Sequence, residues 1–142
     1  MSIHKLDDNL YIAPQLSEED IQKATELGIQ TVICNRPDGE EENQPSFNTI
    51  CQWLDTAGIR HHVHQPVTAP AINTEDAAKF DSLRQQHPAP VLAYCRTGTR
   101  STLLWAYTQA EKGKDSNEIL EAARSVGVDL SNFSERLNNL SR

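Results

Sequence analysis

The stretch Val91–Ser101, with the sequence VLAYCRTGTRS, decides the fold of this chain. Its first four residues form a short apolar run directly after Pro90, which is typical of a buried central strand in a parallel sheet. Such strands deliver ligand-binding loops at their carboxyl ends, and this strand ends on Cys95. A four-residue loop then leads to Arg100 and Ser101, which open a helix. The stretch therefore predicts a strand, a tight loop and a helix, with a cysteine at the turning point.

The loop after this cysteine has the composition of an oxyanion site. Free backbone N–H groups and the positive end of the helix dipole favour an anion, and they favour the thiolate form of a cysteine placed there. Arg100 adds a planar fork that matches phosphate, sulfate or thiosulfate. We interpret Cys95 as a nucleophile. The intervening loop residues are the expected substrate-binding groups: Arg96, Thr97, Gly98 and Thr99. The alternative for a lone cysteine at a strand end is a small buried apolar residue.

Working outward, strands and helices alternate. Apolar and β-branched runs at 10–13, 29–34 and 59–64 predict strands, the first of them an edge strand because Pro14 stops it. Helices between them imply parallel βαβ units. After residue 100 the pattern is helical only, ending with an amphipathic helix over 130–140. We expect a single α/β domain over residues 1–142, with a small, mostly parallel central sheet flanked by helices in three layers and a helical C-terminal third.

Composition narrows the partners. The net charge of −7 disfavours a nucleic-acid partner, and the acidic runs Glu18–Asp20 and Glu40–Glu42 are interpreted as solvated faces. Three cysteines do not make a disulfide framework, and no apolar run has the length of a signal peptide core or a membrane span. We expect a reduced, cytoplasmic protein with no membrane partner, no metal and no other cofactor. The sequence leaves the oligomeric state open.

Two motifs carry a family resemblance. They are Asn35–Glu40 (NRPDGE) after one strand and Tyr94–Ser101 (YCRTGTRS) after a later strand. On these motifs the chain resembles, over nearly its whole length, a bacterial family of candidate phosphatases that also occurs as a domain of beta-lactamase-hydrolase-like proteins. That family is similar in fold to dual-specificity protein tyrosine phosphatases. The resemblance implies a tyrosine-phosphatase-like fold and an anionic phosphate-ester substrate. Some members of the family are described as sulfur transferases.

Under the phosphatase interpretation, the Cys95 thiolate attacks phosphorus and forms a thiophosphate. Loop N–H groups and the Arg100 guanidinium hold the equatorial oxygens. By the resemblance, Ser101 donates a hydrogen bond to the cysteine sulfur as water hydrolyses the thiophosphate.

The sequence identifies a general acid less directly than it identifies the nucleophile. In the dual-specificity pattern it follows the strand at 59–64, near residues 67–69, where the sequence has no carboxylate. Because loops after neighbouring parallel strands share one sheet edge, we expect Asp38 to be the acid and Arg36 to face Cys95. An ordinary Pro-Asp-Gly turn is the alternative for Asp38.

Two other functions stay open. Tyrosine phosphatases place five residues between the cysteine and the arginine, whereas this chain places four. The pattern Cys-Arg-x-Gly-x-Arg is also typical of rhodanese-type sulfurtransferases, which would form a Cys95 persulfide from a sulfane-sulfur donor. The third possibility is a non-catalytic module that binds oxyanions. Cys34 ends its strand much as Cys95 does, and it is either a resolving thiol or, by the default for free cysteine, a buried structural residue.

Overall fold

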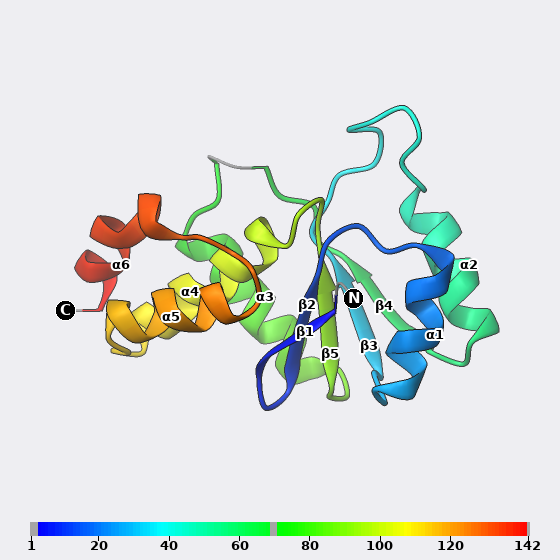
Figure 1. Cartoon of the computed structure of the whole chain (residues 1–142), viewed down its shortest axis with the longest axis horizontal. Coiled ribbons are helices and arrows are strands. Elements are labelled where there is room, and N and C mark those ends of the chain that lie inside the picture. Colours follow the sequence, from blue (N-terminus) through cyan, green and yellow to red (C-terminus); the bar gives the residue numbers. More distant parts are fainter. Residues whose placement is uncertain (1–2, 69–70, 142) are drawn as a thin grey trace.

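The computed structural model of the chain describes residues 3–68 and 71–141. Positions 1, 2, 69, 70 and 142 of the expected domain lie outside the described residues, and they include the end of the 67–69 segment considered above. The described chain contains a five-stranded sheet with the strand order β1-β2-β5-β3-β4 (Figure 1). The strands are β1 (His4–Asp7), β2 (Leu10–Ala13), β3 (Thr31–Cys34), β4 (His61–His64) and β5 (Val91–Tyr94).

The predicted central parallel strand is confirmed as β5, which lies between β2 and β3 and is parallel to both. Its four residues are all buried, as expected for a strand that helices cover on both faces. In the register, Cys34 of β3 lies opposite both Tyr94 of β5 and His64 of β4. The carboxyl ends of these three strands are therefore level, and the loops that follow them meet at one edge.

Three of the helices begin at polar capping residues. Ser17, Ser46 and Asn73 each accept a hydrogen bond from a backbone N–H of the helix that they begin. The helices are α1 (Glu18–Glu26), α2 (Phe47–Thr56), α3 (Thr74–Gln86), α4 (Thr99–Glu111), α5 (Ser116–Ser125) and α6 (Ser134–Leu140).

Two apolar clusters make the three layers (Figure 1). On one face of the sheet, Val32 and Leu92 pack with the buried residues of α1 and α2. On the other face, Ile33 and Ala93 pack with α3, α4, α5 and α6. Side chains on a strand alternate between the two faces, and the sequence supplies apolar residues for both. The α/β fold class and the helical C-terminal third are confirmed.

Two local expectations are wrong. The segment 10–13 is not an edge strand, because β1 pairs with it in antiparallel fashion on its outer side. Of the four β1 residues only Leu6 is buried, so the strand carries little apolar signal. The expected helix over 130–140 begins as a 3₁₀ turn at Ser131–Phe133, and α6 follows it.

Within residues 3–68 and 71–141, no helix is both long enough and apolar enough to cross a membrane.

The helical tail belongs to the core, which a single truncation tests. Leu137 of α6 is fully buried against the cluster that covers α4. We expect Leu137→Ala to lower the free energy of unfolding by about 2–5 kcal/mol in urea titration, because it removes buried methyl groups and leaves a cavity. Leu140→Ala is the matched control, since Leu140 is only partly buried. A tail that does not support the fold would give equal, small losses in both variants.

Candidate active site

Four loops build the site at the carboxyl ends of the parallel strands. Backbone hydrogen bonds join them: Gln15 N donates to Arg96 O (3.2 Å), Asn35 N to Tyr94 O (2.8 Å) and Val67 N to Asn35 O (3.1 Å). These bonds link the loops after β2, β3, β4 and β5. The backbone at the start of the cysteine loop is thus bonded to two neighbouring loops, and the loop after β4 is bonded to one of these.

Gly98 shapes the cysteine loop. Its φ of +88° lies in the left-handed region, and a Cβ there would lie 3.2 Å from the Ile12 side chain. Glycine is the residue that adopts this conformation without strain and leaves this space. The turn directs the Gly98 N–H to Cys95 Sγ at 3.1 Å. Cys95, which is 0% exposed, therefore has a backbone donor aimed at its sulfur.

Arg100 is held from its far end. Its Nη1 donates to Glu40 Oε2 (3.0 Å) and to Val67 O (2.9 Å), and its Nη2 donates to Glu40 Oε1 (2.8 Å). Within the described part of the chain, these bonds use three of the five guanidinium donors. The remaining donors, on Nε and Nη2, share the other edge of the guanidinium plane. A complete two-pronged fork is thus left for an anion.

Arg36, predicted to face the cysteine loop, is 2% exposed, and each of its three guanidinium nitrogens donates a hydrogen bond. Its Nε donates to Glu40 Oε1 (2.9 Å), its Nη2 to Glu41 Oε1 (2.6 Å) and its Nη1 to Gln15 Oε1 (2.9 Å). Arg96 Nε also donates to Glu41 Oε1, at 3.1 Å on the surface. Two glutamates therefore connect three arginines of the site.

These charges reinforce one another. The hydrogen bonds from Arg100 and then Arg36 lower the pKa of Glu40 to about 2, against the desolvation that opposes them. The hydrogen bond from Arg36 lowers the pKa of Glu41 as well, and Glu40 raises the pKa of Arg100. Glu40 is therefore a carboxylate throughout the physiological range and acts as a fixed negative charge.

Sequence reasoning missed Glu40, Glu41 and Gln15. The acidic run Glu40–Glu42 is exposed, as expected for a solvated face, but Glu40 and Glu41 also pair with arginines of the site. The available signal was charge balance: Arg36 and Arg100, placed at one buried edge, require carboxylates nearby.

The remaining residues of the loop keep local contacts. Thr97 Oγ1 and Thr99 Oγ1 lie 3.0 Å apart and share a hydrogen bond. The bond from Ser101 to the cysteine sulfur, expected during hydrolysis of the thiophosphate, stays a prediction. Ser101 Oγ instead donates to Asn35 Oδ1 at 2.7 Å, because an unpaired amide oxygen at this buried position would be unfavourable.

Asp38 lies on the same loop as Arg36 but is bonded elsewhere. Its Oδ1 accepts from the backbone N–H of Phe47, at 2.8 Å, where α2 begins. Asp38 itself is exposed to solvent. Asp38 thus supports a helix start, and its role as general acid stays a prediction.

Cys34 is a buried thiol on the face of the sheet that α1 and α2 cover. It belongs to the apolar cluster beneath α1 and α2, and its Sγ donates to Arg36 O at 3.3 Å. Burial raises the pKa of Cys34 to about 11. His64 Nε2 lies 2.8 Å from the same carbonyl and its ring stacks on Phe47, so both residues support the loop that carries Arg36. These contacts fit a structural cysteine.

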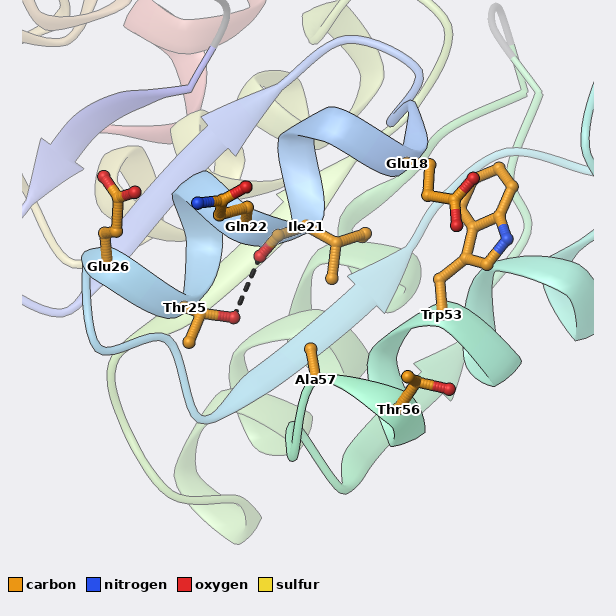
Figure 2. Close-up of a pocket in the computed structure, with 8 residues that line it drawn as sticks. All are labelled: Glu18, Ile21, Gln22, Thr25, Glu26, Trp53, Thr56 and Ala57. Atoms are coloured by element: carbon orange, nitrogen blue, oxygen red, sulfur yellow. Dashed lines mark hydrogen bonds between the residues drawn. The ribbon is translucent and has the colours of Figure 1, made fainter.

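Hollows flank the cysteine loop. One, of about 530 Å³, is lined by Gln15, Asn43, Arg96 and Thr97 among others, and a second beside Arg100 shares Arg96 and Glu41 with it. A separate, more apolar groove lies between α1 and α2. Figure 2 shows Ile21 of α1 on one side of that groove and Trp53 and Ala57 of α2 on the other. The groove has no lining residue in common with the cysteine loop.

Within the described segments, no group of three or more His, Cys, Asp or Glu side chains is arranged to hold a metal ion.

Comparison with known proteins identifies the family of this chain. Residues 2–112 match the family described as beta-lactamase hydrolase-like protein, phosphatase-like domain. The chain belongs to this family. The resemblance drawn from the two motifs is confirmed. The beta-lactamase hydrolase-like protein of Agrobacterium fabrum is 29% identical over 131 residues, which cover 92% of this chain and 30% of that protein. The chain thus spans about a third of this curated relative.

Solved structures support the same fold. A crystal structure of a candidate phosphatase from Neisseria meningitidis is 52% identical, covers 99% of both chains and superposes with a TM-score of 0.96. TpbA of P. aeruginosa, crystallised with phosphotyrosine, is 16% identical, covers 99% of this chain and 90% of its own, and has a TM-score of 0.66. The second likeness establishes the tyrosine-phosphatase-like fold alone.

The Glu40 carboxylate gives the site a pH signature. Its folded pKa of about 2 lies below the ordinary 4.5, so ionised Glu40 stabilises the fold above pH 4.5 and loses this effect as pH falls toward 2. We expect Glu40→Gln to destabilise the protein near neutral pH and to differ progressively less from the parent in acid. Urea titrations at a series of pH values measure the difference.

Glu42→Gln, an exposed change in the same loop, is the control and should show a small difference at every pH. A Glu40→Gln difference that stays constant with pH would contradict the ion-pair assignment.

Proposed function

We propose that the protein is a cysteine-dependent phosphatase that hydrolyses a phosphate monoester through a Cys95 thiophosphate. The observation that carries the proposal is the free edge of the Arg100 guanidinium, next to a loop whose Gly98 N–H points at the Cys95 sulfur. A phosphoryl group between them would receive the fork on two oxygens and the thiolate on phosphorus.

The reaction has two steps. The Cys95 thiolate attacks phosphorus in line, the S–P bond forms, the P–O ester bond breaks, and an acid protonates the leaving alkoxide. Water then attacks phosphorus, the S–P bond breaks, the thiolate departs with the electron pair, and a base takes the proton of the water. The positive end of α4 and Arg100 stabilise the charge on the transferred group in both steps.

Glu40 prepares Arg100 for this task. Because the carboxylate and Val67 O bind the Nη atoms end-on, the guanidinium plane is fixed before substrate arrives. Preorganised charge requires no rearrangement at the moment of reaction. Glu40 is thus a positioning residue, and its low pKa makes it unsuitable as the general acid.

Substrate entry requires movement of the loops, since Cys95 is fully buried in this conformation. The tie that opens with least effect on stability is Arg96–Glu41, because both side chains are more than half exposed. Opening there leaves the buried Arg36 and the Arg100 fork in place.

The similar proteins support a phosphate ester rather than a sulfur donor. The Neisseria meningitidis protein is described as a candidate phosphatase, and TpbA was crystallised with phosphotyrosine. The family match itself is to a phosphatase-like domain. Nothing in these comparisons favours sulfur transfer or a silent binding module.

Asp38 is the proposed general acid. It stands on the loop that carries Arg36 and Glu40, and one of its two carboxylate oxygens accepts the Phe47 N–H. Loss of the hydrogen bond to Phe47 would free this carboxyl group without breaking the contacts between Glu40 and the two arginines.

The central test is turnover of an aryl phosphate. We expect Cys95→Ser to abolish release of inorganic phosphate and Arg100→Lys to lower kcat/KM by about 10²–10³-fold, because an ammonium cannot reproduce the fork. Arg124→Lys is the matched control, an exposed change on α5 that should leave the rate unaffected.

Mass spectrometry after thiosulfate treatment separates the alternatives. One added sulfur on the parent and none on Cys95→Ser, without phosphatase turnover, would replace the proposal with sulfur transfer. Phosphate binding without any turnover, retained in Cys95→Ser, would indicate a binding module.

Asp38 has its own test, which depends on the leaving group. We expect Asp38→Asn to lower kcat by about 10²-fold for an alkyl phosphate and far less for an aryl phosphate, because a poor leaving group needs its proton. The fall in rate toward high pH should also disappear. Glu42→Gln controls for loss of a carboxylate from this loop. Equal losses of kcat on both substrates would contradict the general-acid role and leave Asp38 only as a support for the start of α2.

A further inference from the structure

The hydrogen bond between Ser101 and Asn35 lies at the centre of the site. Both residues are 0% exposed, and the Oγ–Oδ1 distance is 2.7 Å. Ser101 lies three residues after Gly98, on the same side of the first turn of α4, and Gly98 is the residue whose N–H meets the cysteine sulfur. The Ser101 hydroxyl is therefore the side-chain donor of α4 best placed to serve that sulfur.

The direction of the bond is fixed by a third residue. Asn35 Nδ2 donates to Gln65 O at 3.1 Å, so the amide oxygen must face Ser101. A flipped amide would set its oxygen against the Gln65 carbonyl, and two acceptors repel. Ser101 has one proton, and in this arrangement it goes to Asn35.

Gln65 cannot relax to release Asn35. Its backbone N–H donates to Cys34 O at 2.8 Å, and its Nε2 donates to Asp76 O at 3.0 Å in the first turn of α3. The bonds run from α4 through the ends of β3 and β4 to α3, and Gln65 is itself 4% exposed. Partners fixed on several elements leave the hydroxyl rotor little freedom.

We propose that Asn35 is a positioning residue that withholds the Ser101 proton from the Cys95 thiolate. The consequence for catalysis rests on the proposed function. A hydrogen bond to a thiolate stabilises it and weakens it as a nucleophile, because nucleophilicity falls with basicity. By accepting the proton, Asn35 keeps the attacking sulfur basic. The assignment replaces the expected bond from Ser101 to sulfur with its opposite.

The other charges around the sulfur are accounted for. Arg100 on α4 acts on Cys95 directly, and Glu40 and Arg36 of the β3–α2 loop lie beyond it. On β3, burial raises the pKa of Cys34 to about 11, so this thiol stays protonated in the range of interest. None of these groups changes in the variants below.

The test is the titration of the Cys95 thiolate, followed by its ultraviolet absorbance after subtraction of the matching Cys95→Ser protein. We expect Asn35→Ala to free the hydroxyl for the sulfur and to lower the midpoint by about one pH unit, or about tenfold in the thiolate-to-thiol ratio. Ser101→Ala should leave the midpoint at the parent value, and Asn35→Ala/Ser101→Ala should restore it.

Three outcomes would overturn the proposal: a higher midpoint in Ser101→Ala, no shift in Asn35→Ala, or a shift that persists in the double variant. Thiolate titration requires no turnover. A protein that fails to hydrolyse phosphate esters would therefore contradict the proposed function and leave the proposal for Asn35 to be decided by the titration.

Two further variants test whether a shifted midpoint is only a structural effect of the Asn35 substitution. Asn35→Leu keeps most of the side-chain volume without the acceptor, and it replaces Asn35→Ala if that variant does not fold. Thr31→Val is the matched control. Thr31 is 0% exposed and is the first residue of β3, the strand that Asn35 follows, and its Oγ1 donates to Pro88 O at 2.7 Å, at the end of β3 far from the site. It should lower stability and leave the titration unchanged.

Discussion

The site depends on one carboxylate shared between two guanidinium groups. Glu40 Oε1 accepts from Arg36 at 2.9 Å and from Arg100 at 2.8 Å. Without it, the buried guanidinium of Arg36 and the guanidinium of Arg100 would lie near each other without the carboxylate that separates them. With it, the loop after β3 is fastened to the helix after β5, and Arg100 is oriented. Removing one partner would leave a buried charge uncompensated, so this contact constrains both loops.

That contact is possible because of strand register. β3, β4 and β5 end level with one another, so residues far apart in sequence meet at a single edge. This much could be predicted from the sequence. Buried runs, caps such as Ser17 and Asn73, and the break at Pro90 act locally, and local signals determine where strands and helices begin. β1 escaped prediction because its stability comes from pairing with β2 rather than from its own apolar pattern.

The residues of the site also separate into those that local sequence predicts and those that it does not. Cys95, Gly98 and Arg100 could be assigned from the sequence because their chemistry is read within one loop and one helix start. The partners of Arg100 could not, since Glu40 lies 60 residues away and its acidic neighbours resemble ordinary surface. The partner of Ser101 in this structure could not be predicted either. Its hydroxyl donates to Asn35, a buried acceptor in the loop after β3, 66 residues away in the sequence.

The two cysteines at this edge show what sets thiol chemistry. Cys34 is the last residue of β3, whereas Cys95 lies one residue beyond the end of β5, and both are buried. The sulfur of Cys34 meets an apolar layer and donates to a carbonyl, which favours its neutral form. The sulfur of Cys95 accepts a loop N–H at the start of α4 instead. Burial is therefore shared by both residues and does not by itself set the chemistry of a thiol. The difference arises from the direction of the nearest backbone dipoles, which the glycine turn and the helix start provide only at Cys95.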